Sequence, residues 1–173
     1  MSIDYTQAMG VTQLNCLAGK AGAGVSETAT RDTFIENIGY VAGILRRNGL
    51  RLLIEPVNSR DVPGFWLDSV GKAVSLLDEV ASDNVALQFD IYHAQRSGGD
   101  IAATLQETLH RIGHIQFADN PGRHEPGTGE LNFAFLFGLL DRLGYAGWIG
   151  AEYQPASTTE AGLGWLNTYG TKP

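Results

Sequence analysis

The chain has 173 residues, enough for one domain with a hydrophobic core and too few for two, so we treat residues 1–173 as a single domain. With 43% hydrophobic and 18% charged residues it has an ordinary globular composition, and no apolar run approaches the roughly 20 residues of a membrane span. Its net charge of −7 argues against nucleic acids and anionic membranes as main partners, because both select clustered Lys and Arg.

Short apolar runs alternate with amphipathic stretches along the chain. The runs are rich in β-branched and aromatic residues, which is typical of buried parallel strands, and the stretches repeat apolar residues at helical spacing. In chain order we predict a strand at 11–17, a helix at 30–48, a strand at 50–57, a helix at 65–80, a strand at 85–92, a helix at 100–111 that Asp100 caps, a strand at 112–118, a helix at 132–143, a strand at 148–153 and a weaker helix at 158–166. This alternation predicts βα units and a parallel sheet.

Five strands are fewer than the eight of a closed barrel, which normally needs about 250 residues. An open doubly wound sheet would suit the length, but no nucleotide-binding loop supports it, because residues 19–24 lack the Gly-Lys-Ser/Thr order of a phosphate loop. The one cysteine, Cys16, excludes an internal disulfide and a cysteine zinc site. The first residues have neither the basic flank nor the apolar core of a secretory signal, so we expect a cytoplasmic protein.

Polar side chains stand where four of the predicted strands end. They are Glu55, Asp90, Gln116 and Glu152, separated by 35, 26 and 36 residues, which is close to one βα unit each. We therefore expect their oxygens to meet at one end of the sheet. Three carboxylates and an amide oxygen suit Mg²⁺ or Mn²⁺, which can polarise a carbonyl and stabilise an enediolate. Two glutamates, Glu55 and Glu152, could then move a proton between adjacent carbons.

The alternative for these carboxylates is a structural one, in which they form buried salt bridges with Arg51 or Arg123. His93 follows Asp90 by three residues and is interpreted as a proton relay or a substrate hydrogen-bond partner rather than a core histidine. Arg123 lies in a loop after the Gln116 strand, where it could bind a substrate carboxylate through two hydrogen bonds. A surface ion pair of Arg123 with Glu125 or Glu130 is the competing interpretation.

At these residues the chain resembles the hydroxypyruvate isomerase family, which belongs to the xylose-isomerase-like barrel superfamily. The resemblance covers nearly the whole chain, and its most specific part is the run from 121 to 130. The matching segments are 15–19 (NCLAG), 51–58 (RLLIEPVN), 87–93 (LQFDIYH), 113–119 (GHIQFAD), 121–130 (PGRHEPGTGE), 150–153 (GAEY) and 160–165 (EAGLGW).

The resemblance implies a (β/α)8 barrel, present here as about five βα units corresponding to strands four to eight. It implies an isomerase that interconverts hydroxypyruvate and 2-hydroxy-3-oxopropanoate, with Glu55 and Glu152 as the acid/base pair. Metal-site positions fall on both glutamates, Asp90 and Gln116, and substrate-contact positions of the related ketose epimerases fall on His93 and Arg123. Those epimerases have a histidine where this chain has Gln116. The expected partner is a small hydroxy-keto acid.

Other functions compete with this interpretation. A 2-oxo-tetronate isomerase of the same family would act on a substrate with one more carbon. A metal-dependent phosphodiesterase would need more histidine ligands and a basic face. A catalytically inactive, shortened form is the third alternative, because a barrel without its first three strands exposes sheet edges, favours self-association into a homo-oligomer and is expected to fold poorly alone.

Overall fold

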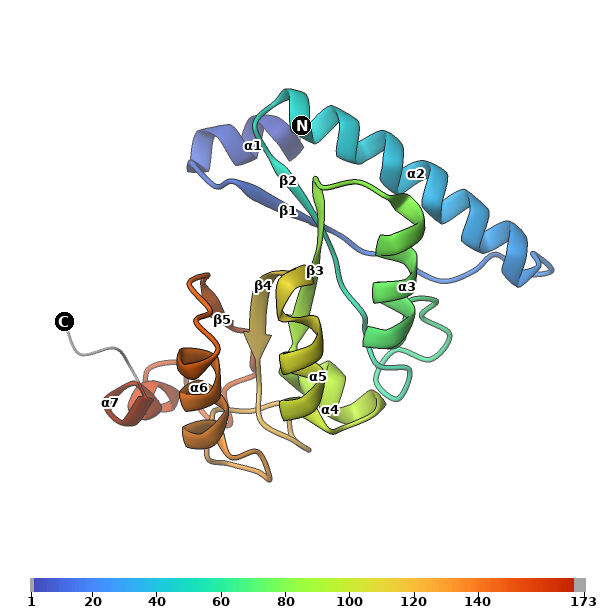
Figure 1. Cartoon of the computed structure of the whole chain (residues 1–173). Helices are drawn as coiled ribbons and strands as arrows, with labels where there is room; N and C mark the ends of the chain where they lie inside the picture. The colour runs from blue at the N-terminus through green and yellow to red at the C-terminus, as the bar shows by residue number, and fades with distance from the viewer. Residues whose placement is uncertain (1, 170–173) are drawn as a thin grey trace.

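The protein is an α/β structure built on a five-stranded parallel sheet; the computed structural model describes residues 2–169. The strands are β1 Gln13–Cys16, β2 Arg51–Ile54, β3 Val85–Asp90, β4 Ile112–Phe117 and β5 Ile149–Ala151. Their order in the sheet is their order along the chain, and every neighbouring pair is parallel. Figure 1 shows the strands in this order, and together they form a curled half-barrel. The predicted partial barrel of five βα units is thereby confirmed.

Helices connect the strands and pack around the sheet, as α2, α3 and α5 show in Figure 1. The α-helices are α1 Ser2–Met9, α2 Glu27–Arg47, α3 Val70–Val80, α4 Ile91–Ser97, α5 Ile101–Thr108, α6 Phe133–Arg142 and α7 Leu166–Tyr169. Two short 3-10 helices, η1 Leu109–Arg111 and η2 Ala161–Trp165, complete the set among the described residues. The predicted strands each have a counterpart, and the predicted helix at 100–111 is divided into α5 and η1. Within residues 2–169, no helix combines the length and apolarity needed to cross a membrane.

Local chemistry explains where the long helices begin and end. The hydroxyl of Ser26 accepts the backbone N–H of Ala29 at 3.2 Å, so α2 starts at residue 27 rather than 30. It ends before Gly49, whose φ of +70° continues the chain into β2. α3 starts at residue 70 rather than 65, because Ser69 caps it by accepting the backbone N–H of Lys72. The apolar residues 65–67, which suggested a helix, are instead buried in irregular backbone.

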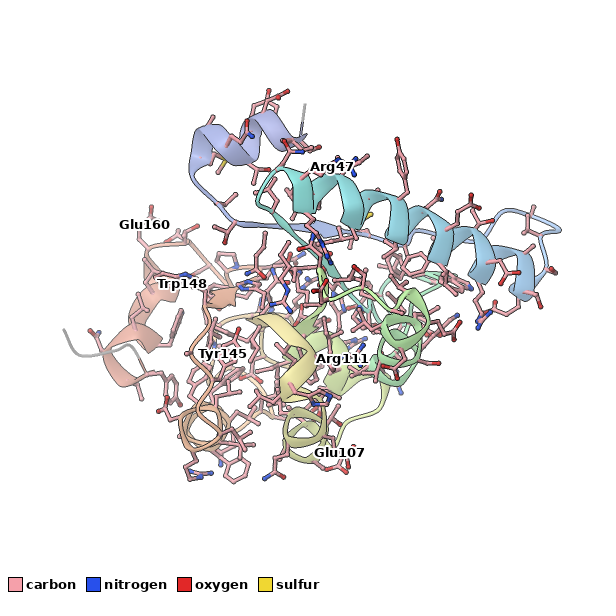
Figure 2. The ribbon with its side chains drawn as sticks, turned by 45° about the horizontal axis from the view of Figure 1, so that its top comes forward. Arg47, Glu107, Arg111, Tyr145, Trp148 and Glu160 are labelled. Atoms are coloured by element: carbon pink, nitrogen blue, oxygen red, sulfur yellow. The ribbon has the colours of Figure 1, made fainter. Side chains whose placement is uncertain are left out.

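The structure corrects two further predictions and adds one helix that was not predicted. Asp100 precedes α5 but has a φ of +49° and makes no side-chain capping hydrogen bond. Helix α4 was not predicted, because its short sequence follows β3 without any turn signal; Asp90 caps it by accepting the backbone N–H of Tyr92. The strand predicted from 148 begins at 149, and Trp148, labelled in Figure 2, is 84% exposed.

The curl of the sheet brings the ends of non-adjacent strands together. Neighbouring strands lie about 4.8 Å apart, so a flat sheet would separate β2 from β5 by roughly 14 Å. Buried apolar side chains fill the space between the strands and the surrounding helices, including Phe89 and Phe117 on β3 and β4. Within the described part of the chain, β1 and β5 each pair with one neighbour and form the two edges of the sheet.

Candidate active site

Four ionisable side chains converge at the carboxyl ends of the strands: Glu55, Asp90, His93 and Glu152. One ligand atom of each lies within 4.8 Å of those of the others. Glu55 follows β2, Asp90 ends β3, His93 lies in α4 and Glu152 follows β5. The first three are buried, with 5%, 3% and 4% of their surface exposed, whereas the side chain of Glu152 is 48% exposed. The structure thus brings together three of the four strand-end residues predicted from the sequence.

Two amide groups hold the carboxylate of Glu55. Its Oε2 accepts hydrogen bonds from Asn15 Nδ2 at 2.5 Å and from Gln88 Nε2 at 2.8 Å. Burial and, after it, the charges of Asp90 and Glu152 together raise the pKa of Glu55 from its ordinary value to about 7. A carboxyl group with this pKa can both release and accept a proton near neutral pH.

Asp90 presents one oxygen to the protein and one to the cluster. Its Oδ1 accepts the backbone N–H of Tyr92 at 2.8 Å, while its buried Oδ2 has no hydrogen-bond partner among the described residues. Burial is the main reason that the pKa of Asp90 rises to about 7. A buried carboxylate oxygen without a partner costs free energy, so Asp90 Oδ2 indicates a position where a cation or a hydrogen-bond donor of a ligand binds.

His93 is neutral at physiological pH, because burial and the nearby positive charge of Arg123 lower its pKa to about 4. Its Nδ1 contacts the side chain of Asn58 at 2.6 Å, and its Nε2 lies 3.7 Å from Asp90 Oδ2. The imidazole is therefore buried with one nitrogen facing the carboxylates, while its role as a proton relay or substrate contact stays a prediction.

Arg123 reaches the same cluster from the loop after β4. Its Nη2 donates to Glu152 Oε2 at 2.8 Å and lies 4.0 Å from Asp90 Oδ2, and its guanidinium stands over the ring of Tyr92. The competing interpretation of Arg123, a surface ion pair with Glu125 or Glu130, is wrong. Arg123 instead makes an ion pair with Glu152. The alternative in which the strand-end carboxylates form salt bridges with Arg51 or Arg123 therefore holds for Glu152 with Arg123.

Asp119, which the sequence did not single out, holds the loop that carries Arg123. It is 1% exposed, and its carboxylate accepts four backbone N–H groups at 2.8 to 3.1 Å. The donors are Asn120, Gly127, Gly129 and Leu131. A Cβ atom on Gly129 would lie 1.7 Å from the carbonyl oxygen of Asn120, so only glycine fits at this point. The available signal was an aspartate followed at once by a loop rich in proline and glycine.

Gln116 lies beside Asp90 in the pairing of β3 with β4, as its position predicted. Its Oε1 accepts a hydrogen bond from Gln88 Nε2, whose amide group also donates to Glu55. Gln88 therefore links Gln116 to Glu55. The sequence did not indicate this link, because Gln88 lies inside β3, two residues before Asp90 at the strand end. The role of Gln116 as a metal ligand stays a prediction.

The cluster could hold a divalent cation. Three carboxylates and one imidazole are offered within a small volume, and the partnerless oxygen of Asp90 points into it. Oxygen-rich donor sets of this kind suit hard cations, and the crowding of like charges would be relieved by a bound positive charge. The residues present therefore fit the metal predicted from the sequence.

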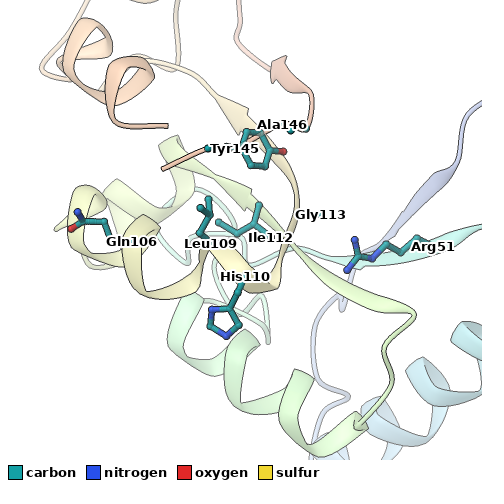
Figure 3. A pocket seen from close by; sticks show the side chains of 10 residues that line it. Arg51, Gln106, Leu109, His110, Ile112, Gly113, Tyr145 and Ala146 are labelled. Carbon is teal, nitrogen blue, oxygen red and sulfur yellow. The ribbon is translucent and has the colours of Figure 1, made fainter. Parts of the chain in front are cut away.

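A separate hollow lies at the opposite, amino-terminal ends of the strands (Figure 3). It is lined in part by Arg51, His110 and Tyr145. Arg51 is the first residue of β2 and Glu55 follows the last, so the alternative of a salt bridge between Arg51 and the strand-end carboxylates is wrong. The hollow is therefore not part of the cluster.

Strands that each deliver one acidic or amide side chain to the carboxyl end of a curled parallel sheet are typical of a (β/α) barrel protein with its active site at that end. Residues 1–169 match the family described as xylose isomerase-like TIM barrel, and the chain belongs to this family.

Two enzymes and one solved structure show how close the similarity is. The chain is 45% identical over 168 residues to the hydroxypyruvate isomerase of Escherichia coli (strain K12) and 42% identical over 168 residues to the 2-oxo-tetronate isomerase of Cupriavidus necator. Both alignments cover 97% of this chain and 65% of the relative. The crystal structure of AP endonuclease, family 2, from Brucella melitensis matches with a TM-score of 0.93 and 39% identity, over 97% of this chain and 65% of that one. The chain thus spans about 65% of the length of these relatives.

Proposed function

We propose that the chain carries the catalytic residues of an isomerase that interconverts hydroxypyruvate and 2-hydroxy-3-oxopropanoate. The observation that carries the proposal is the pair Glu55 and Glu152, whose carboxylate oxygens lie within 4.8 Å of each other beside a buried aspartate. The pKa of Glu55, raised to about 7, suits it to proton transfer at neutral pH. The relatives named hydroxypyruvate isomerase support the choice of substrate.

The reaction moves hydrogen between adjacent carbons without any external oxidant. One glutamate removes a proton from C3 of hydroxypyruvate, and the electrons of the broken bond form the C2–C3 double bond of an enediolate. The other glutamate delivers a proton to C2, while the C3 hydroxyl loses its proton and becomes the new carbonyl. The proton taken up by O2 balances the one that O3 releases. The proposal that both glutamates act on one small substrate is supported by their carboxylate oxygens, which lie within 4.8 Å of each other.

The remaining residues bind and orient the substrate in this proposal. Arg123, which is now paired with Glu152, would exchange this partner for the substrate carboxylate and form a two-pronged contact. His93 would donate a hydrogen bond to a substrate oxygen. We propose Glu55, Asp90, Gln116 and Glu152 as the positions that hold Mg²⁺ or Mn²⁺. Such a cation, when bound, would supply Lewis-acid polarisation of the substrate carbonyl.

A 2-oxo-tetronate isomerase is a second candidate, because the Cupriavidus necator relative is nearly as similar as the Escherichia coli one. A nuclease function, which the name of the Brucella structure suggests, fits less well. The cluster holds one imidazole among three carboxylates, and the chain has a net charge of −7.

The test is an assay of the purified chain with hydroxypyruvate, in which an NADH-dependent reductase consumes the 2-hydroxy-3-oxopropanoate. Metal is first removed with a chelator, and Mg²⁺ or Mn²⁺ is then added back. We expect turnover that is lost in Glu55→Gln and Glu152→Gln and kept in Glu107→Gln, a matched control on the outer helix α5 (Figure 2). The same assay with 2-oxo-tetronate ranks the two substrates. A folded chain that turns over neither substrate would contradict the proposal and favour the inactive form.

A further inference from the structure

We infer that Asn58 is a positioning residue that fixes His93 with its proton on Nε2, so that His93 presents an N–H donor to the cluster rather than a lone pair. The inference deepens the proposed function, since it sets what His93 offers to substrate and metal, but the tautomer itself does not depend on catalysis. Both side chains are buried: Asn58 is fully inaccessible and His93 is 4% exposed.

The orientation of the Asn58 amide is set by Asp61. The backbone N–H of Asp61 donates to Asn58 Oδ1 at 2.9 Å, which identifies the oxygen end of the amide. The opposite end, Nδ2, donates to Asp61 Oδ2 at 3.0 Å. A flipped amide would place an N–H group against the N–H of Asp61 and two oxygens against each other, so this orientation is the only one that satisfies both contacts.

With the amide fixed, the protonation of His93 follows. Asn58 Nδ2 lies 2.6 Å from His93 Nδ1, and the backbone N–H of Asn58 points to the same nitrogen at 3.4 Å. Both groups can only donate, so Nδ1 must accept and carries the lone pair. A neutral imidazole has one proton, which is then on Nε2.

The support extends beyond Asn58 to a network that ties the segment after β2 to α4. The carboxylate of Asp61 also accepts the hydroxyl of Tyr92 at 2.7 Å and pairs with Arg96 at 3.0 Å. Tyr92 is the neighbour of His93 in α4, so the helix that carries His93 and the turn that carries Asn58 are held by the same carboxylate. This network restricts how far the ring and the amide can move apart.

The consequence concerns the four-residue cluster. His93 Nε2 lies 3.7 Å from Asp90 Oδ2, the buried oxygen without a hydrogen-bond partner. A protonated Nε2 can donate to this carboxylate or to a substrate oxygen beside it, but it cannot coordinate a cation while it keeps its proton. Although the geometry groups His93 with the three carboxylates, the tautomer removes it from the ligand set and leaves oxygen donors for a metal.

The tautomer can be read directly by NMR on the ¹⁵N-labelled, metal-free chain at about pH 8, where ordinary histidines are neutral. Correlations between ring nitrogens and ring carbon-bound protons distinguish the protonated nitrogen from the bare one. His124 serves as an internal reference for the opposite tautomer, because its Nδ1 lies 2.7 Å from the carbonyl oxygen of Gln154 and must therefore donate. We expect His93 to show a protonated Nε2 and a bare Nδ1; the reverse pattern would overturn the inference without any variant.

The role of Asn58 is tested by Asn58→Asp, which replaces the donor facing Nδ1 with an acceptor of nearly the same shape. We expect the two ring nitrogens of His93 to exchange their shifts, with Nδ1 becoming protonated. Asn37→Asp, an exposed site on α2, should leave the His93 signals in place. Should Asn58→Asp not fold, Asn58→Ala is used; because the backbone N–H of residue 58 remains, it should raise the share of the Nδ1–H tautomer without reversing the pattern. An unchanged Nε2–H tautomer in a folded Asn58 variant would refute the positioning role, and this readout stands whether or not the chain turns over hydroxypyruvate.

Discussion

Replacing Glu55 by glutamine should stabilise the metal-free protein while abolishing its proposed activity. Glu55 is 5% exposed and faces two other carboxylates, so its ionised form is unfavourable in the folded chain. Glutamine keeps the shape and can still accept the hydrogen bonds from Asn15 and Gln88 through its oxygen. Its amide nitrogen would add an uncharged donor to a cluster in which Asp90 Oδ2 has no hydrogen-bond partner among the described residues.

The size of the effect follows from the pKa of Glu55, which rises from 4.5 to about 7 on folding. The full shift corresponds to about 3 kcal/mol, and coupling to Asp90 reduces the expected gain to about 1 to 3 kcal/mol. Below pH 4.5 the carboxyl is protonated in both the folded and the unfolded chain, so the native residue has no penalty there. The penalty grows as pH rises towards 7 and is complete above it. The advantage of glutamine should therefore be small at pH 4.5 and largest at pH 8.

Urea denaturation of both proteins in chelator, at several pH values from 4.5 to 8, measures this difference. In thermal unfolding of a chain of this size, the same gain in stability at pH 8 corresponds to a rise in Tm of roughly 3 to 10 °C. Glu107→Gln, an exposed site on α5, is the control and should change stability little at any pH. If Glu55→Gln is no more stable than the native chain at pH 8, the reasoning about the buried carboxylate is refuted.

Three further outcomes follow from the same site. Mg²⁺ binding should release protons at pH 6 but few at pH 8, because Glu55 and Asp90, each with a pKa of about 7, must ionise to bind the cation. Calorimetry in buffers of different ionisation enthalpy measures the number of protons released, and equal release at the two pH values would contradict the prediction. Arg123→Lys should raise KM for hydroxypyruvate about tenfold or more with little loss of stability, since lysine can pair with Glu152 but cannot form two hydrogen bonds to the substrate carboxylate. An unchanged KM would argue against the substrate contact of Arg123. Gly129→Ala should lose about 2 kcal/mol or more in urea denaturation, because its Cβ would lie 1.7 Å from a backbone carbonyl oxygen, and native-like stability would show that the loop can yield.

Much of this architecture could be predicted from the sequence because parallel strands align their carboxyl ends. The apolar runs located all five strands, and the side chains at or just after the strand ends, Glu55, Asp90 and Glu152, meet in the structure. The spacing of about one βα unit was sufficient to predict that these side chains meet, since the alignment of strand ends does not depend on how the side chains are packed.

The rest depended on contacts that have no sequence period. Asn58 reaches His93 across 35 positions, and Gln88 joins two strand ends from the layer below them. Asp119 looked like an ordinary loop residue, although it accepts four backbone N–H groups. Arg123 was expected at the site, but its pairing with Glu152 rather than a loop glutamate follows from the curl that brings β5 to the loop. Such pairings become visible only once the sheet is curled.

The most direct test of the proposed proton transfer follows hydrogen exchange at C3 of hydroxypyruvate in D₂O by proton NMR, with Mg²⁺ present. This experiment detects removal of the proton even where the product does not accumulate. The account predicts exchange that is at least about a hundredfold faster with the native chain than with Glu55→Gln, after subtraction of the spontaneous rate. Equal exchange rates for two folded proteins would show that Glu55 does not act on the substrate, and would contradict the assignment of the cluster as an isomerase site.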